Sequence, residues 1–342
     1  MTNEKHNNLR SEQPPIRRTV IIIAIIAVFA TGSAFLLKRL EHREDAAIIA
    51  DSIDNSTYND TYGLIRYGGK WYKQNPDITT LLLIGVDDVK DADEEKSRQS
   101  DFLFVVVMDR ETNSYKALQI NRDTMTDVPQ LDMYGKEFGT AWQQIALAYA
   151  QGNSDVTNSK NTLRAVSNLL YGVNIDHFVC VPMDIVPVVN DLVGGVPVYV
   201  EDDFSGADPS IITGQTNTLQ GSQALTFVRA RQEMEDPTNL ARMERQRTYV
   251  HALHQQTVKK AKSDEDFIIR SLLELAPYIT SDCSTEQLTN FFDIALNQSE
   301  TDIMTIQGEA VSGDEYVEFQ VDEDALQQQV IEMFYVEDTA NE

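Results

Sequence analysis

Continuous apolar runs constrain the fold of this chain more than any other feature. Residues 78–86 have the sequence ITTLLLIGV, and residues 101–109 have the sequence DFLFVVVMD. The turn-like sequence RETNS follows them, and YKALQIN at 115–121 is expected to form the next strand. Short uninterrupted runs of this kind are typical of strands that are buried on both faces. We therefore expect three neighbouring strands in the centre of a sheet.

Helical and strand patterns alternate along the rest of the chain. We expect helices at 140–152 and 156–172, a strand at 177–183, a helix at 184–195, a strand at 196–200, a loop at 202–218, a helix at 220–227 and a long helix at about 240–262. Two further helices, two short strands near 303–319 and an acidic helix near 322–335 are expected after these. The alternation, without an internal repeat, predicts an α/β sandwich.

A 19-residue stretch without charge, TVIIIAIIAVFATGSAFLL at 19–37, is long enough to span a bilayer as a helix. It exceeds a typical signal-peptide core, so we expect an uncleaved signal anchor; cleavage near GSA, after Thr31, is the alternative. Basic residues flank it on both sides, so the positive-inside rule decides little. The short tail before it favours an N-terminus inside the cell and the large domain outside.

Charge and composition exclude several functions. The 342 residues include 54 Asp and Glu against 28 Lys and Arg, giving a net charge of −26. Binding of a long nucleic acid needs a broad basic face, which this composition denies. Cys180 and Cys283 form no disulfide framework or CxxC pair, and the five histidines show no HExxH spacing. The sequence also has no GxSxG, P-loop or GxGxxG motif to support acyl-enzyme or nucleotide-hydrolase chemistry.

Aspartates mark the ends of the three expected central strands. Asp87 and Asp88 end the first strand, Asp101 opens the second, and Asp123 follows the third. If the first and third strands flank the second, these carboxylates gather at one sheet edge, where Mg²⁺ could bind to oxygen ligands. The alternative is that each aspartate forms a turn or caps a helix. The acidic residues at 88–95 fit a solvated loop better.

Arginines are concentrated locally in this acidic chain. Arg122 precedes Asp123, and Arg229 and Arg231 alternate with Val228 and Ala230. In an extended segment the two alternating arginines share one face. Arginine grips phosphate through two donors at once, so these positions predict a site for a small polyanionic group such as pyrophosphate.

A third group of arginines follows in the sequence ARMERQR. Arg242 and Gln246 are four residues apart and share one face of the expected long helix, with Arg245 nearby. The alternative interpretation is a solvated face, in which Arg242, Arg245 and Arg247 pair with Glu233, Glu235 or Glu244.

The order of these motifs resembles the LytR-CpsA-Psr family of cell-envelope proteins. The expected anchor is followed in family order by TTLLLIGVDD, RQSDFLFVVVMD, ALQINRDTM, IALAYAQG, NIDHFVCVPMDIVPVVNDLVGGVPVYV, LQGSQALTFVRAR and ARMERQR. The resemblance covers roughly residues 78–255. It implies an α/β/α sandwich around a central mixed sheet, with a hydrophobic cavity for a lipid tail. Residues 256–342 resemble the variable C-terminal extension of some family members.

The resemblance also implies a function. Family members are extracytoplasmic phosphotransferases that move a glycopolymer, such as teichoic acid or capsular polysaccharide, from a polyprenyl-pyrophosphate carrier to peptidoglycan. The organisation expected for this chain is a cytoplasmic tail (1–18), a transmembrane signal anchor (19–37), a juxtamembrane stalk (38–76), a catalytic domain (77–262) and a C-terminal extension with an acidic tail (263–342). Its partners are then a lipid-linked glycan, peptidoglycan and, through the anchor, the cell membrane, but not nucleic acid.

The functional residues of the family match individual positions in this sequence. The metal-binding aspartates match Asp87 and Asp101, which implies Mg²⁺ as cofactor. The residues implied to bind substrate and catalyse transfer are Arg122, Asp123, Arg229, Arg231 and Arg242, with Gln246 as a further substrate ligand. Asp123 or Asp87 could accept the proton of the acceptor hydroxyl.

Two departures from the family pattern affect the expected site. Gln99 and Ser100 separate Arg98 from Asp101, whereas the family has arginine directly before Ser-Asp, so we do not assign Arg98 to the phosphate. Asn121 replaces the usual proline before Arg122. Two alternatives to a transferase stay open: a non-catalytic protein that binds polyprenyl phosphates or regulates envelope synthesis, and a pyrophosphatase that uses water as acceptor.

Overall fold

The computed structural model describes residues 64–88, 98–112, 114–264, 266–284, 287, 303–313 and 316–338. The expected tail, the anchor at 19–37, most of the stalk and the acidic loop after residue 88 lie outside these residues. Within the described part of the chain, no helix has the length and apolar character needed to cross a membrane.

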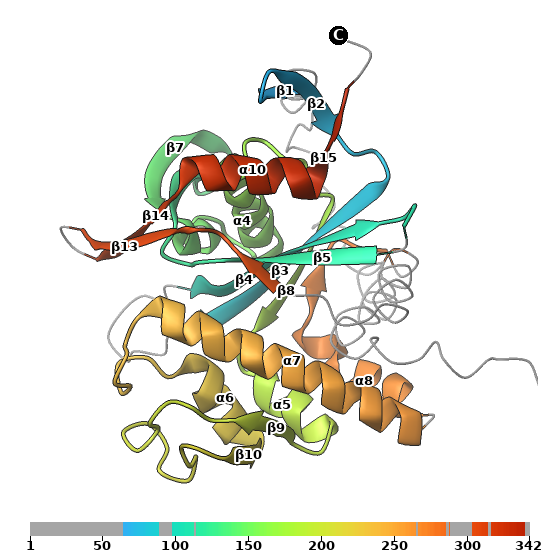
Figure 1. Ribbon diagram of the computed structural model, residues 1–342, viewed down its shortest axis with the longest axis vertical. Helices are drawn as coiled ribbons and strands as arrows, with labels where there is room; N and C mark the ends of the chain where they lie inside the picture. Colours follow the sequence, from blue (N-terminus) through green and yellow to red (C-terminus); the bar gives the residue numbers. More distant parts are fainter. Residues whose placement is uncertain are drawn as a thin grey trace, which may run out of the picture.

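A mixed sheet of six strands forms the centre of the fold (Figure 1). Its order is β11-β8-β3-β4-β5-β12, in which β3, β4 and β5 are antiparallel neighbours, while β3 pairs with β8 and β5 with β12 in parallel. The bounds are β3 (Ile78–Asp88), β4 (Arg98–Asp109), β5 (Ser114–Ile120), β8 (His177–Pro182), β11 (Thr280–Ser281) and β12 (Ile303–Thr305). The three expected central strands are therefore confirmed as neighbours.

Helices cover both faces of this sheet (Figure 1). Because side chains alternate along a strand, Leu82 of β3 packs in one apolar core and Leu83 in the other. On the first face lie η2 (Ile145–Ala150), α4 (Asp155–Leu169) and α10 (Glu323–Phe334); on the second lie α5 (Ile185–Leu192), α6 (Gly221–Arg229), α7 (Asn239–Ser263), α8 (Phe267–Leu275) and η3 (Ala276–Tyr278). The expected sandwich around a central mixed sheet is confirmed.

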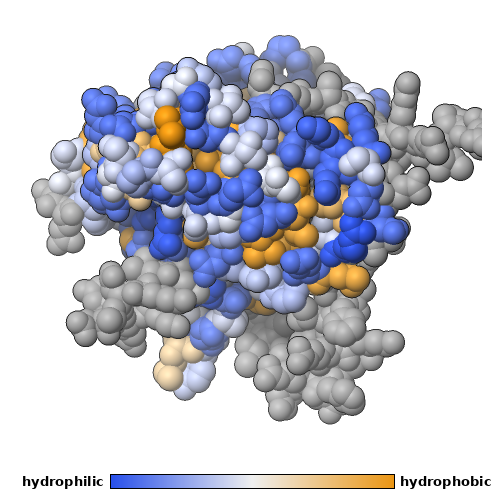
Figure 2. Space-filling model, turned by 90° about the horizontal axis from the view of Figure 1, so that it is seen from below, coloured by the Kyte–Doolittle hydropathy of each residue, from blue (hydrophilic) through white to orange (hydrophobic). Residues whose placement is uncertain are grey.

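Smaller sheets surround the central one. They are formed by β1 (Leu64–Tyr67), β2 (Lys70–Gln74) and β15 (Tyr335–Glu337); by β6 (Met125–Leu131) and β7 (Glu137–Gln144); by β9 (Val196–Tyr199) and β10 (Thr216–Leu219); and by β13 (Gly308–Ser312) and β14 (Val317–Val321). The face that carries α5, α6 and the β9–β10 hairpin is hydrophilic over much of its area, with apolar side chains gathered near its centre (Figure 2).

Several expected elements differ from the structure. The helix expected at 140–152 is wrong over its first part, because residues 137–144 pair with β6 as strand β7 and only Ile145–Ala150 form a short 3₁₀ helix. The loop expected at 202–218 contains the start of β10, which pairs with β9. By contrast, α4 and α7 confirm two expected helices, and each begins at a side-chain cap, Ser154 and Thr238.

The extended segment expected at 228–231 is also wrong in its first half. Helix α6 continues to Arg229, and the backbone leaves the helix only at Ala230, which has φ −51° and ψ 135°. Arg229 and Arg231 therefore do not share the face of a strand. The helix extends because Phe227 and Val228 are both buried in the core beneath the sheet, which a helical turn achieves and an alternating strand does not.

Candidate active site

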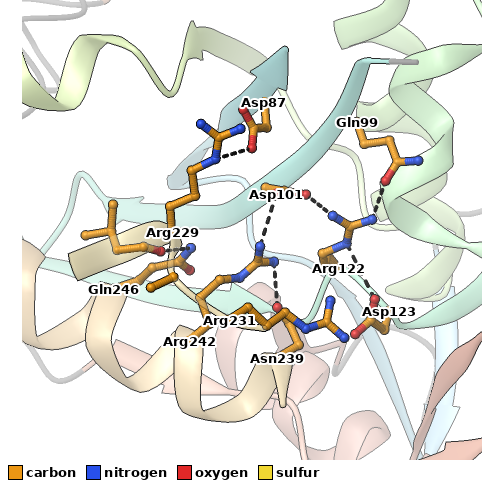
Figure 3. Close-up of polar contacts among 12 residues, drawn as sticks. Asp87, Gln99, Asp101, Arg122, Asp123, Arg229, Arg231, Asn239, Arg242 and Gln246 are labelled. Atoms are coloured by element: carbon orange, nitrogen blue, oxygen red, sulfur yellow. Dashed lines mark hydrogen bonds and ion pairs between the residues drawn. The ribbon is translucent and has the colours of Figure 1, made fainter. Parts of the chain in front are cut away.

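The antiparallel arrangement of β3, β4 and β5 brings the chemically important residues to one edge of the sheet. Asp87 lies near the end of β3, in register with Gln99 at the start of β4. Asp101 follows two residues later on β4, and Arg122 and Asp123 follow the end of β5. The expectation that the first and third strands flank the second is confirmed, and Figure 3 shows the resulting cluster.

Asp101 is the centre of this cluster. One of its carboxylate oxygens, Oδ1, accepts a hydrogen bond from Arg122, and the other, Oδ2, lies 3.1 Å from Nη1 of Arg242 (Figure 3). Arg122 also donates to Oε1 of Gln99, and Arg242 donates to Oδ1 of Asn239 at 2.6 Å. Two arginines from different parts of the chain are thus fixed by one carboxylate.

Arg242 is buried, with only 4% of its surface exposed. Burial lowers the pKa of its guanidinium, while the charge of Asp101 opposes that change. The interpretation of Arg242 as part of a solvated face is therefore wrong. A buried guanidinium that is held by a carboxylate and an amide is pre-organised to face an anion, since its orientation is fixed before the anion arrives.

Arg229 pairs with the other metal-site candidate, Asp87. Its Nε lies 2.8 Å from Oδ2 of Asp87, so the last residue of α6 is tied to the end of β3. Burial is the main cause that raises the pKa of Asp87 above that of an ordinary aspartate; the charge of Arg229 opposes this rise and the charge of Asp101 adds to it. The two carboxylates are near enough to influence each other.

The donor set at this edge suits a hard cation. Asp87 and Asp101 are both buried carboxylates, and their mutual repulsion is the kind that a divalent cation relieves. Each carboxylate oxygen that binds an arginine keeps a second lone pair. The residues present therefore fit Mg²⁺.

Asp123 and Arg231 line a cavity of about 250 Å³ beside this cluster. Oδ1 of Asp123 accepts a hydrogen bond of 3.1 Å from Nε2 of Gln144 and lies 3.4 Å from Nε of Arg122. Burial raises the pKa of Asp123, and the charges of Arg122 and Arg231 oppose the rise. Figure 3 shows the side chain of Arg231 beside Asp123, and its Nε donates to the carbonyl of Pro237 at 2.8 Å.

The C-terminal part of the chain also contributes to this cavity. Ala310, Val317 and Phe319 from the β13–β14 hairpin line it, and the backbone amide of Phe319 donates to the carbonyl of Asp123 at 2.8 Å. Nε2 of Gln144 donates to the carbonyl of Val317 at the same distance. Residues more than 170 positions apart in the sequence are therefore bonded to each other beside the cavity.

Gln246 lies beside Arg242 but is engaged within the protein. Its side chain is buried, accepts from Nε2 of Gln119 at 3.2 Å and donates to the carbonyl of Val228 at 3.4 Å. It links α7 to β5 and α6. The structure thus gives Gln246 a positioning role, and a direct contact with substrate is not needed to explain its place.

Arg245 holds the backbone of the segment that carries Arg229 and Arg231. The solvated-face interpretation is wrong for this residue too, because its guanidinium is buried and donates to the carbonyls of Phe227, at 3.2 Å, and Ala230. Nη1 also lies 2.8 Å from Oδ2 of Asp202. These bonds fix the segment that carries Arg229 and Arg231.

Arg98 lies away from the cluster. It pairs with Asp155 at the start of α4, and its guanidinium is 5.3 Å from the centre of the Tyr149 ring. The decision not to assign Arg98 to the phosphate agrees with this position. Gln99 takes the place beside Arg122 instead, because it lies two residues before Asp101 on the same strand.

Sequence reasoning missed several polar residues that hold the site together. They are Gln99, Asn121, Gln144 and Asn239, whose roles in the site the sequence did not suggest. Their partners are distant in the sequence: Asn239 and Asn121, 118 positions apart, meet at 2.6 Å, and Gln144 bonds to Val317 across 173 positions. The available signal was weak: polar side chains stand beside apolar ones at the ends of the expected strands and helices.

Gly85 gives a first testable prediction, because it lies where the pairing of β3 with β4 shifts register just before Asp87. An added Cβ would come within 2.8 Å of Cβ of Phe102 and 3.2 Å of Sδ of Met183. We expect Gly85→Ala to lower the free energy of unfolding by about 1–3 kcal/mol. Urea unfolding of the variant measures this; an unchanged midpoint would show that the backbone at Phe102 can move aside.

The fold and the site define an α/β sandwich whose sheet edge holds an interlocked cluster of buried carboxylates and arginines. The chain belongs to the LytR-CpsA-Psr family, since the family model LytR_cpsA_psr matches residues 42–334. The expected family resemblance is confirmed.

Curated relatives carry the name polyisoprenyl-teichoic acid–peptidoglycan teichoic acid transferase TagU. The chain is 31% identical to that of Halalkalibacterium halodurans over 183 residues, 54% of either protein. It is 33% identical to that of Bacillus mycoides over 185 residues, which cover 54% of this chain and 53% of the relative. The chain thus matches about half the length of these relatives.

Solved structures share the fold. Bacillus subtilis TagV has a TM-score of 0.56 and 24% identity, covering 76% of this chain and 98% of that one. TagT bound to LIIa-WTA has a TM-score of 0.57 and 21% identity, covering 75% of this chain and 90% of that one. At these identities the likeness establishes the α/β architecture.

Proposed function

We propose that this protein is an extracytoplasmic phosphotransferase that moves a glycopolymer from a polyprenyl-pyrophosphate carrier to peptidoglycan. A teichoic acid or a capsular polysaccharide is the polymer class proposed, and the TagU relatives favour the former. In this proposal the segment 19–37 anchors the protein in the cell membrane as a single span, with the N-terminus inside and the described domain outside.

One observation carries the proposal: four arginines from three segments meet three carboxylates at one sheet edge. The arginines are Arg122, Arg229, Arg231 and Arg242. A protein of net charge −26 gains no solubility from this concentration of positive charge. In the transition state of phosphoryl transfer, negative charge moves to the leaving group. Guanidinium groups whose directions are already fixed stabilise this charge more than water does, because water would first have to reorient.

The chemistry follows from this arrangement. The oxygen of an acceptor hydroxyl attacks the glycan-bearing phosphorus, the bond to polyprenyl phosphate breaks, and the hydroxyl proton passes to Asp123. Arg122 and Arg242 hold the phosphate oxygens, and Arg231 faces the same cavity as Asp123. Asp87 and Asp101 would hold Mg²⁺, which would supply further charge neutralisation to the pyrophosphate.

Asp123 gives a pH prediction. An aspartate acts as a base only when ionised, and burial raises the pKa of Asp123 above its ordinary value of 3.8. The rate of transfer should therefore fall as the pH is lowered. This fall should begin at a higher pH than it would if the base were an exposed aspartate. Replacing Gln144 by leucine removes a hydrogen bond that favours the ionised form. We expect the acid limb of the pH–rate profile to move to still higher pH in Gln144→Leu.

The neighbouring residue provides the control for this shift. Gln143 lies on the opposite face of β7, and its Nε2 is buried without a hydrogen-bond partner. Gln143→Leu should leave the acid limb in place. An equal shift in both variants would show that the effect comes from the hairpin as a whole, and Asp123 would lose its assigned role.

The proposed function is tested with the full-length protein in detergent, Mg²⁺, a polyprenyl-pyrophosphate oligosaccharide and soluble peptidoglycan fragments, read by mass spectrometry. We expect a phosphodiester-linked glycan on the fragment, lost when Mg²⁺ is chelated and restored on its return. Release of sugar phosphate without any need for fragments would favour a pyrophosphatase. Bound but unchanged lipid, alongside an active TagU control, would favour a binding or regulatory protein.

A further inference from the structure

The β6–β7 hairpin exposes large apolar side chains close to the proposed site. The exposed fractions are 77% for Met133, 76% for Tyr134, 72% for Phe138 and 64% for Trp142. Scattered exposed apolar residues are common, but a group of aromatic side chains on one hairpin marks an interaction surface. We refer to Tyr134, Phe138 and Trp142 as the hairpin ridge.

The hairpin ridge is continuous with the site through the geometry of β7. Side chains two residues apart on a strand share a face, so Trp142 and Thr140 lie on the face of Gln144, and both are exposed. Gln144 is the last residue of that face, and its amide contacts Asp123 at 3.1 Å. Phe138 is six positions from Gln144 and lies at the irregularity where the pairing of β7 with β6 shifts register, so the exposed part of the strand extends roughly 20 Å from the site.

The hairpin is fixed in place by its other face. Val128 is fully buried against the core that contains α4. Nδ2 of Asn161 donates to the carbonyl of Pro129 at 3.1 Å, and Nδ2 of Asn168 donates to the carbonyl of Asp127 at 2.7 Å. Both asparagines belong to α4. The exposed aromatic rings therefore stand on a rigid support, which lowers the entropy cost of binding.

The charges around the hairpin ridge disfavour an anionic partner. Asp127 is in register with Trp142, and Asp132 and Glu137 lie in or beside the turn. Lys136 lies in the turn between the two strands, and Arg164 of α4 is already paired with Glu137. A surface of this kind has no excess of positive charge to attract phosphate-rich polymers or anionic lipids.

We infer that the hairpin ridge binds the acceptor, a neutral glycan strand of N-acetylated sugars. Such sugars present apolar C–H faces that stack on aromatic rings, and amide and hydroxyl donors that suit the carboxylates and Thr140. A strand lying along β7 ends at Gln144, where its hydroxyl meets Asp123. The β13–β14 hairpin lies on the same side of the molecule (Figure 1) and contacts this end of β7, where the carbonyl of Val317 accepts from Gln144 at 2.8 Å. The inference rests on the proposed transferase function.

Binding is measured first, without any lipid donor, so that it does not depend on turnover. The chain has two tryptophans, so in a Trp71→Phe background the fluorescence of Trp142 reports on the hairpin ridge alone. Soluble peptidoglycan fragments should quench or shift this fluorescence in a saturable way. Calorimetry should show at least tenfold weaker binding of the fragments to full-length Phe138→Ala/Trp142→Ala.

The control is Leu273→Ala, since Leu273 on α8 is equally exposed, at 72%. It should bind fragments as the parent does. In the transfer assay the ridge variant should raise KM for the fragment at least tenfold, with KM for the lipid donor unchanged.

Two results would overturn the inference. One is equal binding of the fragments to the parent and the ridge variant. The other is a ridge variant that loses binding to phosphatidylcholine vesicles and keeps binding to fragments, which would assign the hairpin ridge to the membrane surface. If fragments bind as expected but no glycan is transferred, the assignment of glycan binding to the hairpin ridge is supported and the transferase proposal fails.

Discussion

Asp101→Asn is expected to have the largest effect of any single substitution in this protein. The neutral amide leaves buried Arg242 without its carboxylate and removes one partner of Arg122. Breaking a buried ion pair from one side costs roughly 3–5 kcal/mol of the free energy of unfolding. Transfer should fall at least about 10²-fold, because both arginines lose their fixed directions. Urea unfolding and the transfer assay measure the two effects.

A double-mutant cycle separates the charge effect from simple disruption. Arg242→Met removes the buried charge and keeps apolar volume, so Asp101→Asn/Arg242→Met should be less destabilised than the sum of the two single variants. Asp264→Asn provides the control, because its ion pair with Arg270 is exposed; its unfolding midpoint should not change. Additive losses in the cycle would refute the coupling of Asp101 with Arg242.

Arg231→Ala is expected to lower transfer by about 10²-fold while leaving the stability of the fold almost unchanged. The side chain of Arg231 is half-buried at the cavity and donates to the carbonyl of Pro237. Its removal therefore leaves no buried charge unpaired. Asp123 loses only the attraction of the Arg231 charge and keeps that of Arg122. Arg231→Lys should recover only part of the rate, since an ammonium group lacks the planar fork of arginine.

The control for this variant is Arg270→Ala, which removes an exposed arginine from α8. It should transfer glycan at the rate of the parent. A normal rate in Arg231→Ala would contradict its assignment to the phosphate, and a large drop in its unfolding midpoint would show a structural role instead.

Much of the fold was predictable because its signals are local. Strands β3 and β4 contain long apolar runs, LLLIGV and FLFVVVM, and α4 and α7 have clear caps. The segment at 140–152 misled because the small apolar residues of IALAYA suit a helix, whereas the preceding residues are held by pairing with β6. That pairing is a contact between strands, and helical periodicity in a single segment does not detect it.

In the candidate site, too, local signals in the sequence were predictive and contacts between distant segments were not. Asp87, Asp101, Arg122 and Asp123 could be placed together from strand order alone, and the structure brings them to one edge. The arginines of α6 and α7 were expected on a strand face and a helix face, yet Arg229 ends a helix and Arg245 faces inward. Their partners are backbone carbonyls and distant carboxylates, which composition and spacing do not reveal.

Hydrophobic pattern and charge along the chain were enough to predict the buried strands, the family and the residue types expected to bind a phosphate. The tertiary structure alone decided which arginine pairs with which carboxylate, that Gln144 reaches Asp123, and that β13–β14 closes the cavity. Hydrogen bonds and ion pairs depend on separations of about 3 Å in space, and chain separation does not fix these distances.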